Sequence, residues 1–190
     1  DMTEPRFASS PLGIAIGIAA MVFIVGLSNY AVQFPINDWL TWGALTYPVA
    51  FLVTDLTNRS LGPKAARQVI YAGFALAVVL SVWLATPRIA IASGGAFLVA
   101  QLLDVAVFNR LRAGVWWRAP VVSSTLGSIV DTALFFSIAF AGTGLPWVTW
   151  ALGDFGAKMA MAGCLLIPFR LLMPALRPHF APGDLPSASN

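Results

Sequence analysis

Five charged residues of this chain lie inside long apolar stretches: Asp55, Asp104, Asp131, Asp154 and Lys158. A charge deep in a membrane helix costs a few kcal/mol and usually faces a cavity or a charged partner. A carboxylate can accept two parallel N–H bonds from one edge of a flat heterocycle. The charged set therefore favours a binding site for a planar, polar molecule.

Neutral polar and aromatic residues recur at helical spacing beside these charges. Gln101 precedes Asp104 by three residues, and Phe97 precedes Gln101 by four, so the three share a helix face. Amide groups can bind a carbonyl edge, and aromatic rings can stack on a heterocycle. The predicted substrate-binding residues are the charges and their neighbours: Asp131, Gln101, Asp104, Asp55, Asn58, Ser124, Lys158, Asp154, Phe97 and Asn29.

The sequence lacks the groups that an enzymatic or metal site would need. Its only histidine, His179, lies in the C-terminal tail, and its only cysteine, Cys164, lies in an apolar run. There is no Cys/His cluster for zinc. There is also no Gly-rich loop ending in Lys-Ser or Lys-Thr, which would bind a nucleotide. We therefore expect no enzymatic activity, no metal and no cofactor.

The elements that position these residues are membrane helices. Hydrophobic residues make up 58% of the chain and charged residues 10%, whereas a soluble domain carries about 25% charge. A membrane helix needs about 20 mainly apolar residues. Six segments meet this requirement, at residues 12–34, 41–58, 66–85, 89–108, 120–141 and 148–172. The sequence predicts an all-α transmembrane domain over 1–173 and a disordered cytoplasmic tail over 174–190.

The basic residues predict how these helices are oriented. Nine of the eleven Lys and Arg residues fall at one end of the predicted helices, Arg88 falls at the other, and Lys158 is inside a helix. An excess of Lys and Arg marks the cytoplasmic side. We therefore expect both termini in the cytoplasm. This asymmetry also explains the formal charge of +3 without a nucleic-acid partner.

Depth along the helices singles out one acid. At a rise of about 1.5 Å per residue, Asp131 and Lys158 fall near the middle of the membrane, with Asp154 one turn further out. Lys158 could keep Asp131 ionised until a substrate competes for the carboxylate. Alternatively, Asp154 and Lys158 could simply neutralise each other, because they are four residues apart. Asp131 is therefore predicted to be the acid whose substitution impairs function most.

Four stretches of the sequence combine several short motifs: YPVAFLVTDLTNRSLGPKAARQV (47–69), ASGGAFLVAQLLDVAVFNRLR (92–112), SSTLGSIVDTALFF (123–136) and KMAMAGCLLIPFR (158–170). Together they resemble the bacterial queuosine-precursor transporters, also described as vitamin uptake transporters. The resemblance implies uptake of 7-cyano-7-deazaguanine and 7-aminomethyl-7-deazaguanine across the inner membrane. Many members of this family have Asn-Glu at the positions where this chain has Asn58 and Arg59. A role for the family's glutamate therefore does not carry over to this chain.

The sequence thus predicts a six-helix secondary carrier for a purine-like substrate in the bacterial inner membrane. Its partners are the lipid bilayer and the substrate, and a homodimer is left open. One alternative is a substrate-binding membrane subunit driven by a separate ATPase. An intramembrane enzyme is disfavoured because the catalytic groups are missing. A structural scaffold is disfavoured because it would not need five intramembrane charges.

Overall fold

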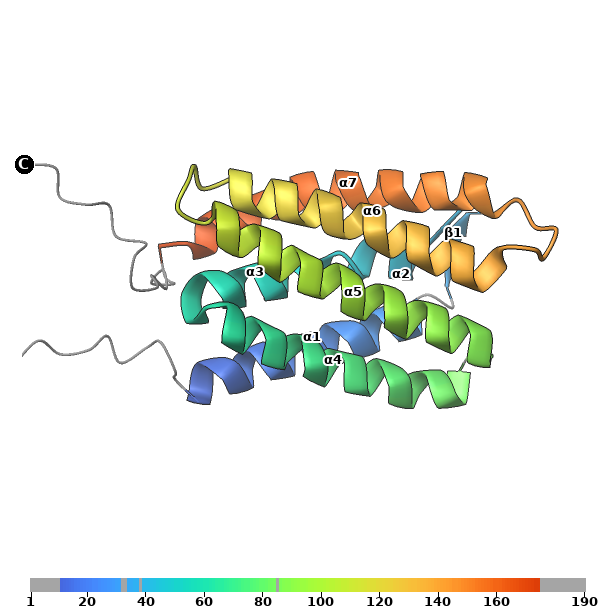
Figure 1. Cartoon of the computed structure of the whole chain (residues 1–190), viewed down its shortest axis with the longest axis horizontal. Coiled ribbons are helices and arrows are strands. Elements are labelled where there is room, and N and C mark those ends of the chain that lie inside the picture. The colour runs from blue at the N-terminus through green and yellow to red at the C-terminus, as the bar shows by residue number, and fades with distance from the viewer. Residues whose placement is uncertain (1–10, 32–33, 38, 85, 175–190) are drawn as a thin grey trace, which may run out of the picture.

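The computed structural model describes residues 11–31, 34–37, 39–84 and 86–174. The predicted tail and His179 therefore lie almost entirely outside the described residues. The described part is a helix bundle with one short hairpin (Figure 1). The helices are α1 (Pro11–Ala31), α2 (Trp42–Thr46), α3 (Val49–Leu61), α4 (Pro63–Leu84), α5 (Pro87–Leu111), α6 (Arg118–Phe140) and α7 (Trp147–Leu172). The strands are β1 (Pro35–Asn37) and β2 (Leu40–Thr41).

Four of the described helices are long and apolar enough to cross a membrane: α1, α5, α6 and α7. These four helices are typical of a multi-pass membrane protein. Helices α2 and α3 have five and 13 residues, so neither is long enough to cross alone. The predicted count of six crossings and the predicted orientation remain predictions.

The short helix α3 has the most central position. It contacts α1, α2, α4, α5, α6 and α7. Around it, α1 packs on α4, α4 on α5, α5 on α6, and α6 on α7. Any polar side chain on the inner faces of α3 is therefore surrounded by protein rather than lipid.

The predicted continuous helix over 41–58 was wrong, because it is broken at Pro48. Helix α2 ends at Thr46, Tyr47 and Pro48 form a turn, and α3 begins at Val49. Proline has no N–H to donate within a helix, and its ring clashes with the preceding turn. The break separates Tyr47 from α3, so its side chain does not continue the face of that helix.

The predicted loop after the first helix contains the hairpin of β1 and β2, which pair antiparallel. The Asn37 side chain stabilises its turn by accepting hydrogen bonds from the backbone N–H groups of Trp39 and Leu40, both at 2.9 Å. Asparagine commonly stabilises turns in this way. At the other end of the bundle, Gly62 turns α3 into α4 with a positive φ of 85°, a conformation that glycine adopts without steric cost.

Arg88 joins the start of α5 to the end of α6. Its guanidinium donates to the carbonyl oxygens of Ile138 at 2.7 Å and Ala141 at 2.6 Å. The last carbonyl groups of a helix have no partner within it. Arg88 therefore supplies a partner for the end of α6 and links the two helices that pack on each other.

Two apolar clusters hold the bundle together. The larger joins α1, α3, α4 and α5 and includes Met21, Val69, Ile70 and Phe97. The smaller includes Phe108 of α5 and Phe169 of α7, whose rings meet edge to face at 6.3 Å. The polar clusters described next lie among these helices.

Candidate functional site

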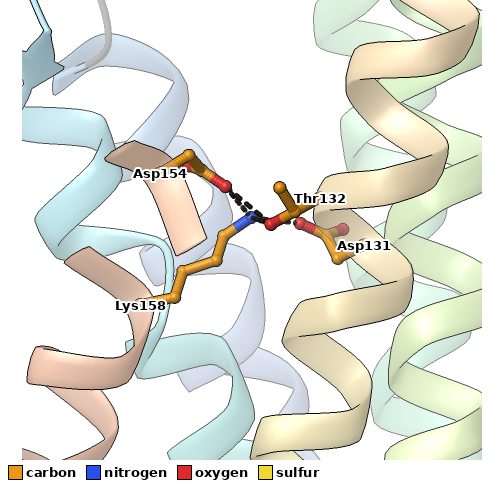
Figure 2. A network of polar contacts seen from close by, with 4 residues as sticks. All are labelled: Asp131, Thr132, Asp154 and Lys158. Carbon is orange, nitrogen blue, oxygen red and sulfur yellow. Dashed lines mark hydrogen bonds and ion pairs between the residues drawn. The ribbon is translucent and has the colours of Figure 1, made fainter. Parts of the chain in front are cut away.

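Lys158 is the centre of a polar network between α6 and α7 (Figure 2). Its Nζ atom is 2.6 Å from Oδ2 of Asp131 and 2.5 Å from Oδ2 of Asp154. It also donates to Thr132 Oγ1 at 3.1 Å, and the Thr132 hydroxyl donates to Asp154 at 2.8 Å. Asp131 and Lys158 are each 4% exposed. The two ion pairs that the sequence left as alternatives therefore form together on one lysine.

The charge of this Lys158 network is not balanced. Two carboxylates and one ammonium group sum to a formal charge of minus one. Ion pairing offsets part of the desolvation cost of burying these groups. The remaining negative charge favours a ligand that brings N–H donors, because hydrogen bonds to a charged acceptor are the strong ones.

Aromatic rings lie next to the Lys158 network. The Lys158 ammonium lies 5.8 Å from the centre of the Tyr47 ring, close enough for a cation–π contact. Tyr47 also lies near Asp131, and its ring meets the edge of the Phe97 ring at 6.1 Å. The turn at Tyr47 and Pro48 thus places the Tyr47 ring beside this network.

A second polar cluster joins α3, α5 and α6. Asp55 is 2% exposed and Asp104 is fully buried, and the two carboxyl groups are near enough to interact. The hydroxyl groups of Ser123 and Ser124 donate to the two oxygens of Asp55, at 3.4 and 3.5 Å. We call these four residues the Asp55–Asp104 cluster.

Hydrogen bonds between α3 and α5 flank the Asp55–Asp104 cluster. Thr54 donates to the side-chain oxygen of Gln101 at 2.7 Å. Asn58 donates to the backbone oxygen of Val105 at 3.2 Å. Thr54, Asn58 and Gln101 are all fully buried, so this helix interface is polar along more than one turn.

One cavity reaches both clusters. Its wall includes Asp55 and Ser124 from the Asp55–Asp104 cluster and Lys158 from the other network. The volume that a water-sized sphere can reach is about 20 Å³, which is room for about one water molecule. A bicyclic base is larger, so helices around the cavity must separate before such a ligand can enter.

Helix α7 forms much of the apolar wall of this cavity, through Ala162, Leu165, Leu166 and Phe169. It is also the least buried of the four apolar helices. In its most apolar segment 11% of the residues are buried inside the bundle, compared with 50% in α5. Moving α7 would therefore break fewer contacts than moving α5.

The structure gathers most of the predicted site residues but separates them into two groups. Asp131, Asp154, Lys158 and Phe97 lie at or beside the Lys158 network. Asp55, Asp104, Ser124, Asn58 and Gln101 lie in or beside the Asp55–Asp104 cluster. Asn29 joins neither group, because its side-chain amide donates to the backbone of Val25 one turn earlier in α1. Whether any of them binds substrate remains a prediction.

Sequence reasoning missed one member of the Lys158 network, Thr132. A hydroxyl next to an intramembrane acid was the available signal, together with its position four residues after Ser128 on the same helix face. Both residues are buried. Position on a helix face alone did not reveal that Thr132 would bridge to α7.

Comparison with known families gives the context of this geometry. The family model described as "Putative vitamin uptake transporter" matches residues 41–86 and 80–173. The chain belongs to this family. The matched segments include both polar clusters, whereas Asn29 lies outside them. As a family member, the chain is a transporter and not an enzyme.

Three curated relatives carry transport names. The "Probable queuosine precursor transporter" of Haemophilus influenzae is 39% identical over an alignment that covers 77% of this chain and 80% of the relative. The "Queuosine precursor transporter" of Escherichia coli is 36% identical, also over 77% of this chain and 80% of the relative. A "Probable queuosine precursor transporter" of Bacillus subtilis is 26% identical over 54% of this chain and 57% of the relative. No solved structure matches the chain significantly.

Proposed function

We propose that this transporter imports queuosine precursors, 7-cyano-7-deazaguanine and 7-aminomethyl-7-deazaguanine, across the bacterial inner membrane as a secondary carrier. The observation that carries the proposal is the identity of 39% and 36% to two relatives named for queuosine precursors, over 77% of this chain. The Lys158 network supports it by offering the acceptor groups that such a base requires.

Recognition of the base centres on Asp131. A deazaguanine presents a ring N–H and an amino group side by side, and this edge matches the two oxygens of a carboxylate. Lys158 occupies Oδ2 of Asp131 at 2.6 Å, so the base competes with Lys158 for that atom. Lys158 then keeps Asp154 as its partner at 2.5 Å. The displacement therefore does not leave a buried ammonium group without a counter-charge.

Three further side chains have the right chemistry for the rest of the base. The rings of Tyr47 and Phe97 offer apolar faces beside the Lys158 network, where a heterocycle can stack. The side-chain nitrogen of Gln101 is buried and has no hydrogen-bond acceptor among the described residues. It is a suitable donor to the carbonyl oxygen of the base, since buried donors are normally paired.

Substrate entry requires the cavity to enlarge, and α7 is the element proposed to move. Lys158 and Asp154 lie on α7, whereas Asp131 lies on α6 (Figure 2). Separation of these helices would therefore weaken the contact between Lys158 and Asp131 as it opens the space for a base. Opening and recognition would be the same event.

Uptake by purified protein tests the proposal. Proteoliposomes that contain only this chain should exchange labelled 7-cyano-7-deazaguanine, and unlabelled guanine derivatives without the 7-substituent serve as competitors. Liposomes that lack the protein are the control. Uptake that appears only after an ATPase complex is added would favour the alternative of a substrate-binding subunit. No uptake under either condition, with correctly inserted protein, would contradict the proposed substrate class.

A further inference from the structure

The Asp55–Asp104 cluster differs from the Lys158 network in having no cation. Among the described residues, neither carboxyl group forms an ion pair, although both are almost completely shielded from solvent. Two ionised carboxylates this close in a low-dielectric interior would repel each other strongly. One additional positive charge is therefore needed at the cluster.

The hydrogen bonds of the Asp55–Asp104 cluster also indicate that a positive charge is missing. Neither oxygen of Asp104 accepts a hydrogen bond from a described residue. The two nearby hydroxyl groups, of Ser123 and Ser124, are instead directed to Asp55. A proton held by one carboxyl would give the other carboxylate the donor that it lacks. A metal ion would instead need a shell of oxygen ligands and space around it.

The positions of the charged groups around the cluster are consistent with a proton as the missing positive charge. Asp104 faces Asp55 from α5, α6 contributes hydroxyl groups, and Lys158 of α7 lines the same cavity. Arg59 follows Asp55 by one turn at the end of α3. The described titratable side chains of α1 and α4 are exposed: Tyr30, Lys64, Arg67 and Tyr71.

We propose that Asp55 and Asp104 share one proton, which enters with each substrate molecule from outside and is released into the cytoplasm. The cluster is thereby assigned to coupling, and Asp131 to substrate binding. The proton comes from water on the outer side and returns to water on the inner side, so no other reactant is required. The coupling role rests on the proposed function, whereas the shared proton does not.

The shared cavity explains why the substrate and the proton would be transported together. Asp55 and Lys158 both line it, so a conformation that opens the cavity to one side exposes both clusters to that side. Simultaneous access to the substrate and the proton is what co-transport in one direction requires. Separate access routes for the two clusters would have predicted uncoupled leakage of protons.

Infrared spectroscopy tests the shared proton directly. Purified wild-type protein should contain a band from a protonated, buried carboxyl group, and this band should disappear in Asp104→Asn. The asparagine amide can donate to Asp55 in place of the proton, so the variant is expected to fold. Asp184→Asn changes an acid outside the described residues and should leave the band unchanged. A band that persists in both Asp104→Asn and Asp55→Asn would overturn the proposal.

Transport measurements test the coupling. With one proton per substrate, a gradient of one pH unit supports about tenfold accumulation of 7-cyano-7-deazaguanine. Asp104→Asn should retain exchange of labelled for unlabelled substrate but lose this accumulation, whereas Asp184→Asn should behave as wild type.

The outcomes separate the two proposals. If wild-type protein does not exchange the substrate, the proposed function fails, and the infrared experiment still decides the shared proton. If exchange occurs but accumulation follows a sodium gradient, or is unchanged in Asp104→Asn, the coupling role of the cluster is refuted.

Discussion

Asp131 already has a competitor for any ligand, because the Lys158 ammonium lies 2.6 Å from its Oδ2 atom. A ligand must therefore offer the carboxylate more than the lysine does. Two N–H donors in a plane satisfy this condition, since they can engage both oxygens, whereas Lys158 contacts Oδ2. If Asp131 binds the substrate as proposed, the affinity of the site is the difference between two interactions at one carboxylate.

Asp131→Asn should abolish most of this recognition. It replaces a charged acceptor pair by one acceptor and one donor, with almost no change in shape. A hydrogen bond to a charged group contributes about 1.5–3 kcal/mol, so affinity for 7-cyano-7-deazaguanine should fall about 10- to 150-fold. Substrate titration of the purified variant measures this. Wild-type affinity would reduce Asp131 to a structural role.

Thermal unfolding of related variants provides the control. Asp131→Asn should be only mildly destabilising, because Lys158 keeps Asp154 and Thr132 as partners. Lys158→Met leaves two carboxylates without a cation and should cost about 3–5 kcal/mol. Combining Lys158→Met with Asp131→Asn and Asp154→Asn should recover stability without restoring binding. Binding by this triple variant would contradict the assigned role of the network.

At the scale of elements, the turn at Tyr47 and Pro48 determines which side chains meet at the site. Pro48→Ala should allow α2 and α3 to join and move Tyr47 away from Asp131 and Phe97. Losing one aromatic contact of about 0.5–1.5 kcal/mol predicts a decrease in substrate affinity of about 2- to 10-fold. Pro87→Ala is the matched control, because a proline at the first position of a helix is not needed to break it. Equal substrate affinities in the two variants would contradict the proposed role of this turn in placing Tyr47 for substrate binding.

A pair of glycines tests how closely α6 packs on α3. A Cβ atom at Gly127 of α6 would lie 2.7 Å from the Phe51 ring, whereas one at Gly156 of α7 would meet nothing within 4 Å. Gly127→Ala should destabilise the protein by about 1–3 kcal/mol through overpacking. Gly156→Ala should stabilise it by up to about 1 kcal/mol through helix propensity. Unfolding of both variants in the same detergent gives the comparison.

The elements were largely predictable from sequence, because long apolar runs and proline or glycine breaks mark helix ends. The predicted helix over 148–172 differs from α7 by one residue at its start, and that over 89–108 falls within α5. The break at Pro48 was missed because the apolar pattern continues through it. The division of the acids into two clusters was also missed, since helix faces identify inward-pointing residues but not which helices become neighbours.

For the whole molecule, the described basic residues outside the helix interiors, except Arg88, gather at one end of the bundle. The end of α3, the start of α4, the junction of α5 and α6, and the end of α7 lie together at the left of Figure 1. Arg59, Lys64, Arg110, Arg118 and Arg170 lie at these helix ends. The fold therefore gathers the residues whose count predicted the cytoplasmic side.

Cysteine labelling tests this orientation. In a Cys164→Ser background, Thr143→Cys introduces a thiol between α6 and α7, and Gly114→Cys introduces one between α5 and α6. A membrane-impermeant reagent added to intact spheroplasts should label the first variant and should reach the second only after permeabilisation. The opposite pattern would place the basic end outside and refute the predicted topology.

Arg88 is the one basic residue at the other end of the predicted helices, and its two hydrogen bonds change how it counts. It contacts the carbonyl groups of Ile138 and Ala141. Ile138 lies in the last turn of α6, at the negative end of the helix dipole, and Ala141 directly follows the helix. The helix that it caps thus offsets part of its charge, because a helix C-terminus carries about half a negative charge. In electrostatic terms, the Arg88 end of the bundle therefore contributes even less positive charge to the predicted orientation than the count of one against nine indicates. The residue that looks like an exception to the charge asymmetry is thus one whose charge the fold partly offsets.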